Sequence, residues 1–181
     1  MGRIIGIRIK NYGSLKDIKL GKLLFDSKDV KELTNMNAII GQSGTGKSTL
    51  ADAFGFLADS LEKGVEVACD LNGRGGYETI ISQGAQGPIE FEIYYREKSN
   101  ESPITYELFI GLDKAGRPII EKERLRQRRK NERYGRPMSF LFLEYGKGYA
   151  FKGNDGGRSD EGDQEIGDKV DIELADPRQM G

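Results

Sequence analysis

Eight consecutive residues, 41–48, have the types and spacing needed to hold the phosphate groups of a nucleotide. They read Gly-Gln-Ser-Gly-Thr-Gly-Lys-Ser and match the pattern G-x-x-x-x-G-K-S/T in full. In such a loop, successive backbone N–H groups point inward and surround the phosphates. Glycine is needed where the backbone takes left-handed angles or lies against the ligand. The motif therefore predicts a nucleoside triphosphate site.

Each polar side chain of the motif has its own expected part. Lys47 should reach the β- and γ-phosphates and act in catalysis, the Ser48 hydroxyl should coordinate Mg²⁺, and Thr49 should donate to the α-phosphate. The expected cofactors are ATP and Mg²⁺, since the N-K-x-D sequence that reads guanine is absent. The residues predicted to contact the nucleotide are Gly41, Gln42, Ser43, Gly44, Thr45, Gly46, Lys47, Ser48 and Thr49.

The segments on either side are those that such a loop requires. Residues 36–40, Met-Asn-Ala-Ile-Ile, are short and apolar and predict a buried strand. Residues 47–63 predict a helix, because apolar side chains recur at i, i+3, i+4 and i+7. They are Leu50, Ala53, Phe54, Leu57, Ala58 and Leu61, and Gly64 stands at the expected C-cap. The first turn of this helix would add unpaired N–H groups and the positive end of the helix dipole.

Hydrolysis of a triphosphate needs further groups, usually an apolar strand that ends in an Asp and is followed by a Glu. Residues 108–113 and 140–144 are apolar runs that end in an acid. Both lie among alternating strands, and Asp113 opens a turn, so neither acid is assigned to a metal site. The chain therefore predicts nucleotide binding more firmly than hydrolysis.

Composition excludes several other kinds of site. The chain has no histidine and one cysteine, Cys69, which excludes His-based catalysis, zinc sites built on His and an intrachain disulfide. The formal net charge of −1 does not indicate a uniformly basic nucleic-acid binder. No apolar run approaches the ~20 residues that a membrane helix needs. A cytoplasmic protein without membrane contact is the simplest interpretation.

The rest of the chain predicts an antiparallel sheet with charged connections. Alternating or β-branched segments predict strands at 3–10, 15–20, 77–82, 89–96, 104–113, 118–125 and 139–151, with a turn at 113–116. Residues 121–136 carry 8 basic and 3 acidic residues, and 122–136 is expected to be a basic hairpin loop. Residues 153–168 are rich in Gly and Asp and are predicted to be mobile.

These elements predict a single α/β lobe over residues 1–181, with a mixed sheet and one main helix. Residues 1–65 would hold a strand pair, the phosphate loop and the helix. Residues 66–152 would form an antiparallel β-lobe that includes the basic loop 122–136. Residues 153–181 would be an acidic mobile segment followed by the start of a next lobe.

Three features of the first 60 residues carry a family resemblance. Residues 7–17 are similar to an "I-x-N-F-R-S-x-x-D" start, residues 37–50 match "N-x-I-x-G-x-N-G-x-G-K-S-x-L", and Asp52-Ala53 continues the helix. In this the chain resembles the N-terminal portion of RecF/SMC/OLD-type AAA (ABC-like) P-loop ATPases. The resemblance implies Asn11 and Ser14 as further nucleotide contacts and Gln179 as the Q-loop glutamine that senses Mg²⁺ and the attacking water. Gly13 departs from the usual Arg or Lys, and Ser43 from the usual Asn.

No L-S-x-G signature, Walker B acids or switch His is found in the chain. The resemblance therefore implies the ATP-binding half of a head with an ABC-like β-lobe. Such a protein would hydrolyse ATP only as a complete head, in a homodimer with ATP between the subunits. It also implies work on DNA in repair, chromosome organisation or phage defence, with the basic loop as a contact. Two alternatives remain: a small P-loop nucleotide or metabolite kinase, and a non-catalytic interaction module that keeps the loop.

Overall fold

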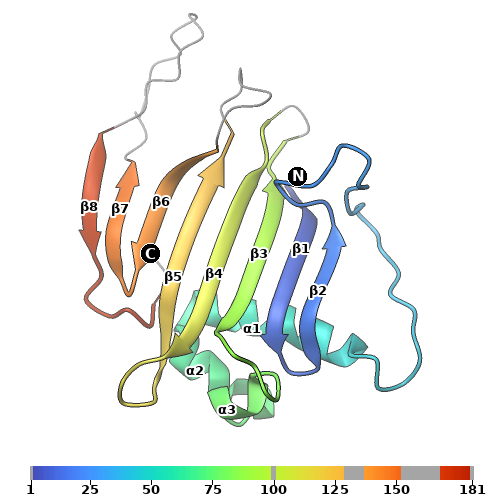
Figure 1. The fold of residues 1–181 in the computed structure, drawn as a ribbon, viewed down its shortest axis with the longest axis horizontal. Helices are drawn as coiled ribbons and strands as arrows, with labels where there is room; N and C mark the ends of the chain where they lie inside the picture. Colours follow the sequence, from blue (N-terminus) through green and yellow to red (C-terminus); the bar gives the residue numbers. More distant parts are fainter. Residues whose placement is uncertain (1, 99–100, 129–136, 152–167, 180–181) are drawn as a thin grey trace, which may run out of the picture.

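The computed structural model describes residues 2–98, 101–128, 137–151 and 168–179. In these ranges eight strands form one sheet, and three α-helices lie against one of its faces (Figure 1). The strands are β1 (Arg3–Tyr12), β2 (Leu15–Gly21), β3 (Ile89–Arg96), β4 (Ile104–Leu112), β5 (Pro118–Gln127), β6 (Met138–Glu144), β7 (Lys147–Phe151) and β8 (Lys169–Glu173). The helices are α1 (Lys47–Lys63), α2 (Val65–Asp70) and α3 (Tyr77–Ile80), with a 3₁₀ turn, η1 (Leu71–Gly73), between the last two. None of these described helices is long and apolar enough to cross a membrane.

The strand order is β2-β1-β3-β4-β5-β6-β7-β8. Strands adjacent in sequence are therefore adjacent in the sheet, except that β1 lies between β2 and β3. Every strand pair in the described ranges is antiparallel. The prediction of a mixed sheet is wrong for these residues, because the apolar segment 36–40 forms no strand.

The main apolar core lies between the sheet and α1. Strand residues that alternate along β1, β3 and β4 face the helix, and α1 meets them with a stripe centred on Phe56. The Phe56 ring lies 6.1 Å from the ring of Phe91 and 5.4 Å from that of Tyr12, centroid to centroid. The predicted helix is confirmed at residues 47–63, and this core fixes how it lies on the sheet.

The opposite face of the sheet carries charged side chains in cross-strand rows. One row runs Arg8, Glu92, Glu107 and Arg124 across β1, β3, β4 and β5. The Glu107 carboxylate accepts hydrogen bonds from Arg124 and Arg126. Glu92 stands directly opposite Glu107, and burial together with the Glu107 charge raises the pKa of Glu92. This like-charge pair disfavours the folded state when both groups are ionised.

We expect Glu92→Gln to raise the free energy of unfolding at pH 7 by up to about 1 kcal/mol. A carboxyl group whose pKa is raised by folding stabilises the protein while it is protonated, and this stabilisation is lost as pH rises through its folded pKa. The gain should therefore shrink as pH falls from 7 to about 4. Urea unfolding at both pH values measures it. Glu90→Gln, which loses the ion pair with Lys10 at 3.1 Å, is the control that should gain nothing. A less stable Glu92→Gln protein at pH 7 would contradict the expectation.

Two further strand predictions, at 77–82 and 139–151, differ from the structure. Residues 77–80 form α3 instead of a strand, and only Ile81 makes a bridge, to Tyr12. Gly76, at φ 91°, begins this helical turn, and the turn places Tyr77 and Ile80 on one buried side. The predicted strand 139–151 is two strands, β6 and β7. They are joined by Tyr145 and Gly146, both at positive φ, which is the geometry of a two-residue hairpin turn.

The structure also contains elements that the sequence patterns did not predict. No element was assigned to the residues of helix α2 or strand β8, and β8 comes directly after residues 153–168, which were predicted to be mobile. The start of the basic loop 122–136 belongs to β5 as far as Gln127. Residues 129–136 and 152–167, which hold the rest of that loop and most of the acidic segment, lie outside the described residues.

Candidate nucleotide-binding site

The phosphate loop, residues 41–48, joins an exposed segment to the start of α1. Gly44 and Gly46 have φ of 82° and 88°, in the left-handed region that glycine alone adopts without strain. A Cβ on Gly41 would lie 2.9 Å from Thr45 Oγ1, closer than such contacts allow. The backbone of the loop therefore requires glycine at positions 44 and 46, and the Thr45 side chain leaves no room for a Cβ at position 41.

Lys47 folds back across this loop. Its ammonium donates to the carbonyls of Gly41 at 2.7 Å and Gln42 at 2.5 Å, and lies 3.5 Å from Thr45 Oγ1. Thr45 Oγ1 in turn donates to the Gln42 carbonyl at 2.8 Å. An ammonium group has three donors, so a phosphate oxygen can replace the weak contact to Thr45 while the two carbonyls keep the charge in place.

The start of α1 is open to an anion. Gly46 is the N-cap, no side chain caps the helix, and the first turn holds no acidic residue. The first intrahelical bond runs from the Leu50 N–H to the Gly46 carbonyl at 2.8 Å. The N–H groups of Lys47, Ser48 and Thr49 therefore have no acceptor within the helix, and they lie at the positive end of its dipole.

Ser48 is exposed at this helix start, as a Mg²⁺ ligand would have to be. Among the described residues, no group of three or more Asp, Glu, Cys or His side chains could hold a metal ion. A Mg²⁺ here would have the Ser48 hydroxyl as a protein ligand, with the remaining positions filled by phosphate oxygens and water. The site therefore suits Mg²⁺ brought with a nucleotide better than a metal bound alone.

The end of β1 and the turn that follows it contact the first turns of α1. Ser14 Oγ and Thr49 Oγ1 are 3.0 Å apart, and the Tyr12 hydroxyl donates to Asp52 at 2.5 Å. A Cβ on Gly46 would come within 3.0 Å of Leu15 and Ser14. Of the two contacts implied by the family resemblance for this turn, Ser14 is thus brought beside the phosphate loop.

Asn11 has a different place. Its side-chain amide donates to the carbonyls of Pro88 at 2.8 Å and Gly87 at 3.4 Å. The Ser82 N–H donates back to the Asn11 carbonyl at 3.0 Å. Asn11 therefore fastens the connection 82–88 to the β1–β2 turn, and its amide makes these bonds instead of pointing into the phosphate loop.

Gln179 lies at the far end of α1. The preceding residue, Arg178, accepts the Val65 N–H at 3.0 Å with its carbonyl and pairs with Glu66 at 2.6 Å. Gln179 itself lies beside Gly64. The 17 residues of α1 separate it from the phosphate loop, which is about 24 Å at 1.5 Å per residue. The structure does not bring Gln179 to the loop, and its predicted catalytic role would require residues 174–179 to move.

The two acids that end apolar runs both lie next to turns. Asp113 Oδ1 accepts the N–H groups of Ala115 and Arg117, and its Oδ2 pairs with the Arg117 guanidinium at 3.0 Å. These bonds lower the pKa of Asp113, first of all the one from the Arg117 N–H. The predicted turn at 113–116 is confirmed. Glu144 is exposed and precedes the β6–β7 turn.

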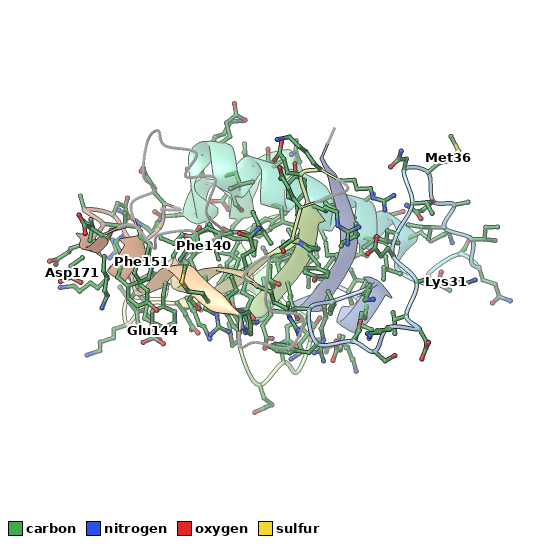
Figure 2. The ribbon with its side chains drawn as sticks, turned by 90° about the horizontal axis from the view of Figure 1, so that it is seen from above. Lys31, Met36, Phe140, Glu144, Phe151 and Asp171 are labelled. Atoms are coloured by element: carbon green, nitrogen blue, oxygen red, sulfur yellow. The ribbon has the colours of Figure 1, made fainter. Side chains whose placement is uncertain are left out.

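Apolar side chains in the segment before the phosphate loop and along α1 are exposed. Ile40 is 94% exposed and Met36 is 88% exposed, and Figure 2 shows Met36 pointing outward, away from the sheet. On α1, Phe54 and Leu61 are 38% and 64% exposed. We call Met36, Ile39, Ile40, Phe54 and Leu61 the outer apolar surface. The prediction of a buried strand at 36–40 is wrong here, because none of the described strands pairs with it.

A cluster of charged residues on α1 and after η1 was not predicted from the sequence. Arg74 is buried and pairs with Asp52 at 3.0 Å and Asp59 at 2.6 Å. The acids are seven positions apart on α1, which a helical periodicity could have suggested. Nothing in the sequence around Arg74 indicated that its partners lie 15 and 22 residues earlier.

Comparison with known proteins supports the P-loop interpretation. A protein-family model described as "AAA domain, putative AbiEii toxin, Type IV TA system" matches residues 36–145. No curated protein and no solved structure matched. The matched segment begins with the exposed residues 36–40, includes the phosphate loop and α1, and ends just after β6. Since it covers well over half of the 181 residues, the chain belongs to this family of AAA domains, which are ATP-binding domains of the P-loop ATPase type.

Proposed function

We propose that this chain is the ATP-binding part of a RecF/SMC/OLD-type ATPase and that ATP·Mg²⁺ binds at the phosphate loop. The observation that carries the proposal is the Lys47 ammonium, held by the Gly41 and Gln42 carbonyls across a glycine loop. The uncapped start of α1 lies directly beside it. Fixed charge, free N–H groups and an exposed hydroxyl at Ser48 are the three parts that triphosphate binding needs.

Hydrolysis on this proposal needs a second part that supplies acids. The described residues place no cluster of acids near the loop. Three residues of the outer apolar surface, Met36, Ile39 and Ile40, come directly before the loop in the chain, and exposed apolar side chains that lie together mark sites of association. The missing acids and a signature loop would come from a further ATPase segment and from a second subunit, with ATP between two heads.

The direct test is a titration of the 181-residue chain with a fluorescent ATP analogue. Saturable binding, displaced by unlabelled ATP and ADP and weakened by removal of Mg²⁺, is the expected result. AMP should compete poorly, because it lacks the β- and γ-phosphates that Lys47 would contact. Binding that AMP displaces as well as ATP would contradict a phosphate-loop site.

We expect the chain on its own to turn over ATP barely or not at all. Positioning and charge around the γ-phosphate are the main sources of catalysis in phosphoryl transfer, and the described residues provide the loop without the acids. Steady-state phosphate release should be indistinguishable between the unmodified chain and Lys47→Ala. An appreciable rate that Lys47→Ala abolishes would show that the chain is a complete ATPase.

A DNA partner remains a proposal that rests on the family resemblance and on charge. Within the described part of the basic loop, Arg124 and Arg126 already pair with Glu107. The Arg128 guanidinium donates to the Leu24 carbonyl at 3.3 Å. These contacts reduce the charge that this part of the loop offers to a phosphate backbone, so any DNA contact would depend mainly on residues 129–136.

A further inference from the structure

Arg74 joins two turns of α1 from behind. Its side chain is 4% exposed, and it donates to Asp52 Oδ1 from Nε and to Asp59 Oδ2 from a terminal nitrogen. That terminal nitrogen also donates to the Ala68 carbonyl of α2 at 3.0 Å. The guanidinium carbon lies 5.5 Å from the centre of the Phe56 ring. Because the guanidinium is buried, loss of either carboxylate would leave part of its charge uncompensated.

Asp52 is the end of this cluster nearest to the phosphate loop. It lies one helical turn after Ser48 and three residues after Thr49. One of its carboxylate oxygens accepts from Arg74 and the other accepts from the Tyr12 hydroxyl. Tyr12 belongs to β1, and its ring is buried against Phe56. The first turns of α1 are thus held both from the sheet side and from the side of η1.

We propose that Asp52, clamped between Tyr12 and Arg74, is a positioning residue for the nucleotide site. It fixes the rotation of the first turn of α1, and so the directions of the Ser48 and Thr49 hydroxyls and of the free N–H groups. The Ser14–Thr49 contact depends on the same rotation, because Tyr12 and Ser14 belong to one turn. This inference rests on the proposed function, since it assigns a role at that site.

Three groups around Asp52 keep their protonation states over the neutral pH range. Burial, and then the Asp52 carboxylate, raise the pKa of Tyr12, which therefore stays a hydrogen-bond donor. The hydrogen bond from Arg74 lowers the pKa of Asp59. Arg74 itself is always protonated. The two donors to Asp52, Tyr12 and Arg74, therefore stay protonated at neutral pH.

Two acids on one helix give a matched test. Asp52→Asn and Asp59→Asn each remove one charge that faces Arg74, but Asp59 lies two turns farther from the loop. The Asp59 side chain is the more buried, 18% exposed against 40% for Asp52, and its contact with Arg74 is shorter. A merely structural role predicts that Asp59→Asn is at least as damaging to nucleotide binding.

We expect Asp52→Asn to weaken binding of a fluorescent ATP analogue about tenfold, as the loss of one charged hydrogen bond would. Asp59→Asn should change affinity less than about twofold when both proteins are compared at equal fractions folded. Tyr12→Phe removes only the hydroxyl and should weaken binding severalfold. Its control is Tyr77→Phe, which removes a buried hydroxyl that donates to the Ile110 carbonyl.

The readouts separate the outcomes. Amide hydrogen exchange over residues 47–51 should speed up in Asp52→Asn and Tyr12→Phe and not in the two controls. Equal effects of Asp52→Asn and Asp59→Asn on affinity, or a Tyr12→Phe protein that binds like the unmodified chain, would overturn the positioning role. If Asp52→Asn does not fold, the Tyr12→Phe and Tyr77→Phe pair decides alone. Failure of the unmodified chain to bind the analogue would overturn the proposed function, and the positioning role with it.

Discussion

Replacing Lys47 with Ala should lower the affinity for ATP by at least about 100-fold, or roughly 2.7 kcal/mol. The Lys47 ammonium contacts the phosphate loop directly, and its two carbonyl contacts hold it there before any ligand arrives. Its removal takes away charge-assisted hydrogen bonds to two phosphates. It also removes the Lys47 hydrogen bond to the Gly41 carbonyl and leaves the Gln42 carbonyl with the Thr45 hydroxyl as its remaining donor, so the loop loses part of its shape.

Isothermal titration of both proteins with ATP·Mg²⁺ measures the effect. Lys63→Ala is the control, since Lys63 is an exposed cation at the other end of α1 with a long contact, 3.8 Å, to Glu62. It changes net charge by the same amount and should leave affinity within about twofold, because exposed ion pairs contribute little. Nucleotide affinity that survives Lys47→Ala would mean that the nucleotide binds elsewhere.

Phe56→Ala should reduce the free energy of unfolding by about 3–5 kcal/mol. The ring is fully buried, between Tyr12 and Phe91 and under the Arg74 guanidinium. Its loss leaves a cavity at the contact between α1 and the sheet, and such a cavity closes poorly because the strands on one side are fixed by their ladders. The arginine also loses the ring face on which it lies.

Phe54→Ala provides the comparison, because it removes the same ring from the same helix on the outer apolar surface. It should cost less than about 1 kcal/mol, as expected for a partly exposed side chain. Urea unfolding followed by circular dichroism measures both variants. Similar losses for Phe54→Ala and Phe56→Ala would mean that the outer surface is covered in solution, as in a self-associated chain.

Local periodicity accounts for the parts of the fold that the sequence allowed us to predict. The alternation around Ile7 and Ile9, and the helical spacing of Leu50, Ala53 and Leu57, depend only on which side of an element is buried. The phosphate loop was predictable for a related reason. Its glycines are needed for the positive φ angles of a short loop, and these angles depend only on nearby residues. Both kinds of signal are complete within about ten to twenty residues.

The predictions that were wrong concerned residues whose conformation depends on partners far away in the chain. Ile39 and Ile40 read as a buried strand, but burial needs a neighbouring strand, and the described sheet offers them none. Tyr145 is a strand-forming residue type, yet it takes φ 49° because the hairpin needs it there. The role of Arg74 could not be predicted from the residues around it, because its partners are two carboxylates on α1. The sequence therefore allowed the phosphate loop to be predicted, but not the Arg74 cluster that contacts the helix after it.

The position of β1 in the sheet has a consequence for the order in which the chain is made. Its inner edge is completed by β3, where Ile9 pairs with Phe91. At ~5–20 residues per second, β3 leaves the ribosome several seconds after β1. In that interval the edge of β1 that β3 later covers is unpaired and could pair with another nascent chain. Arg8 and Lys10 alternate with the isoleucines of β1, and their like charges oppose such pairing between two copies of the hairpin.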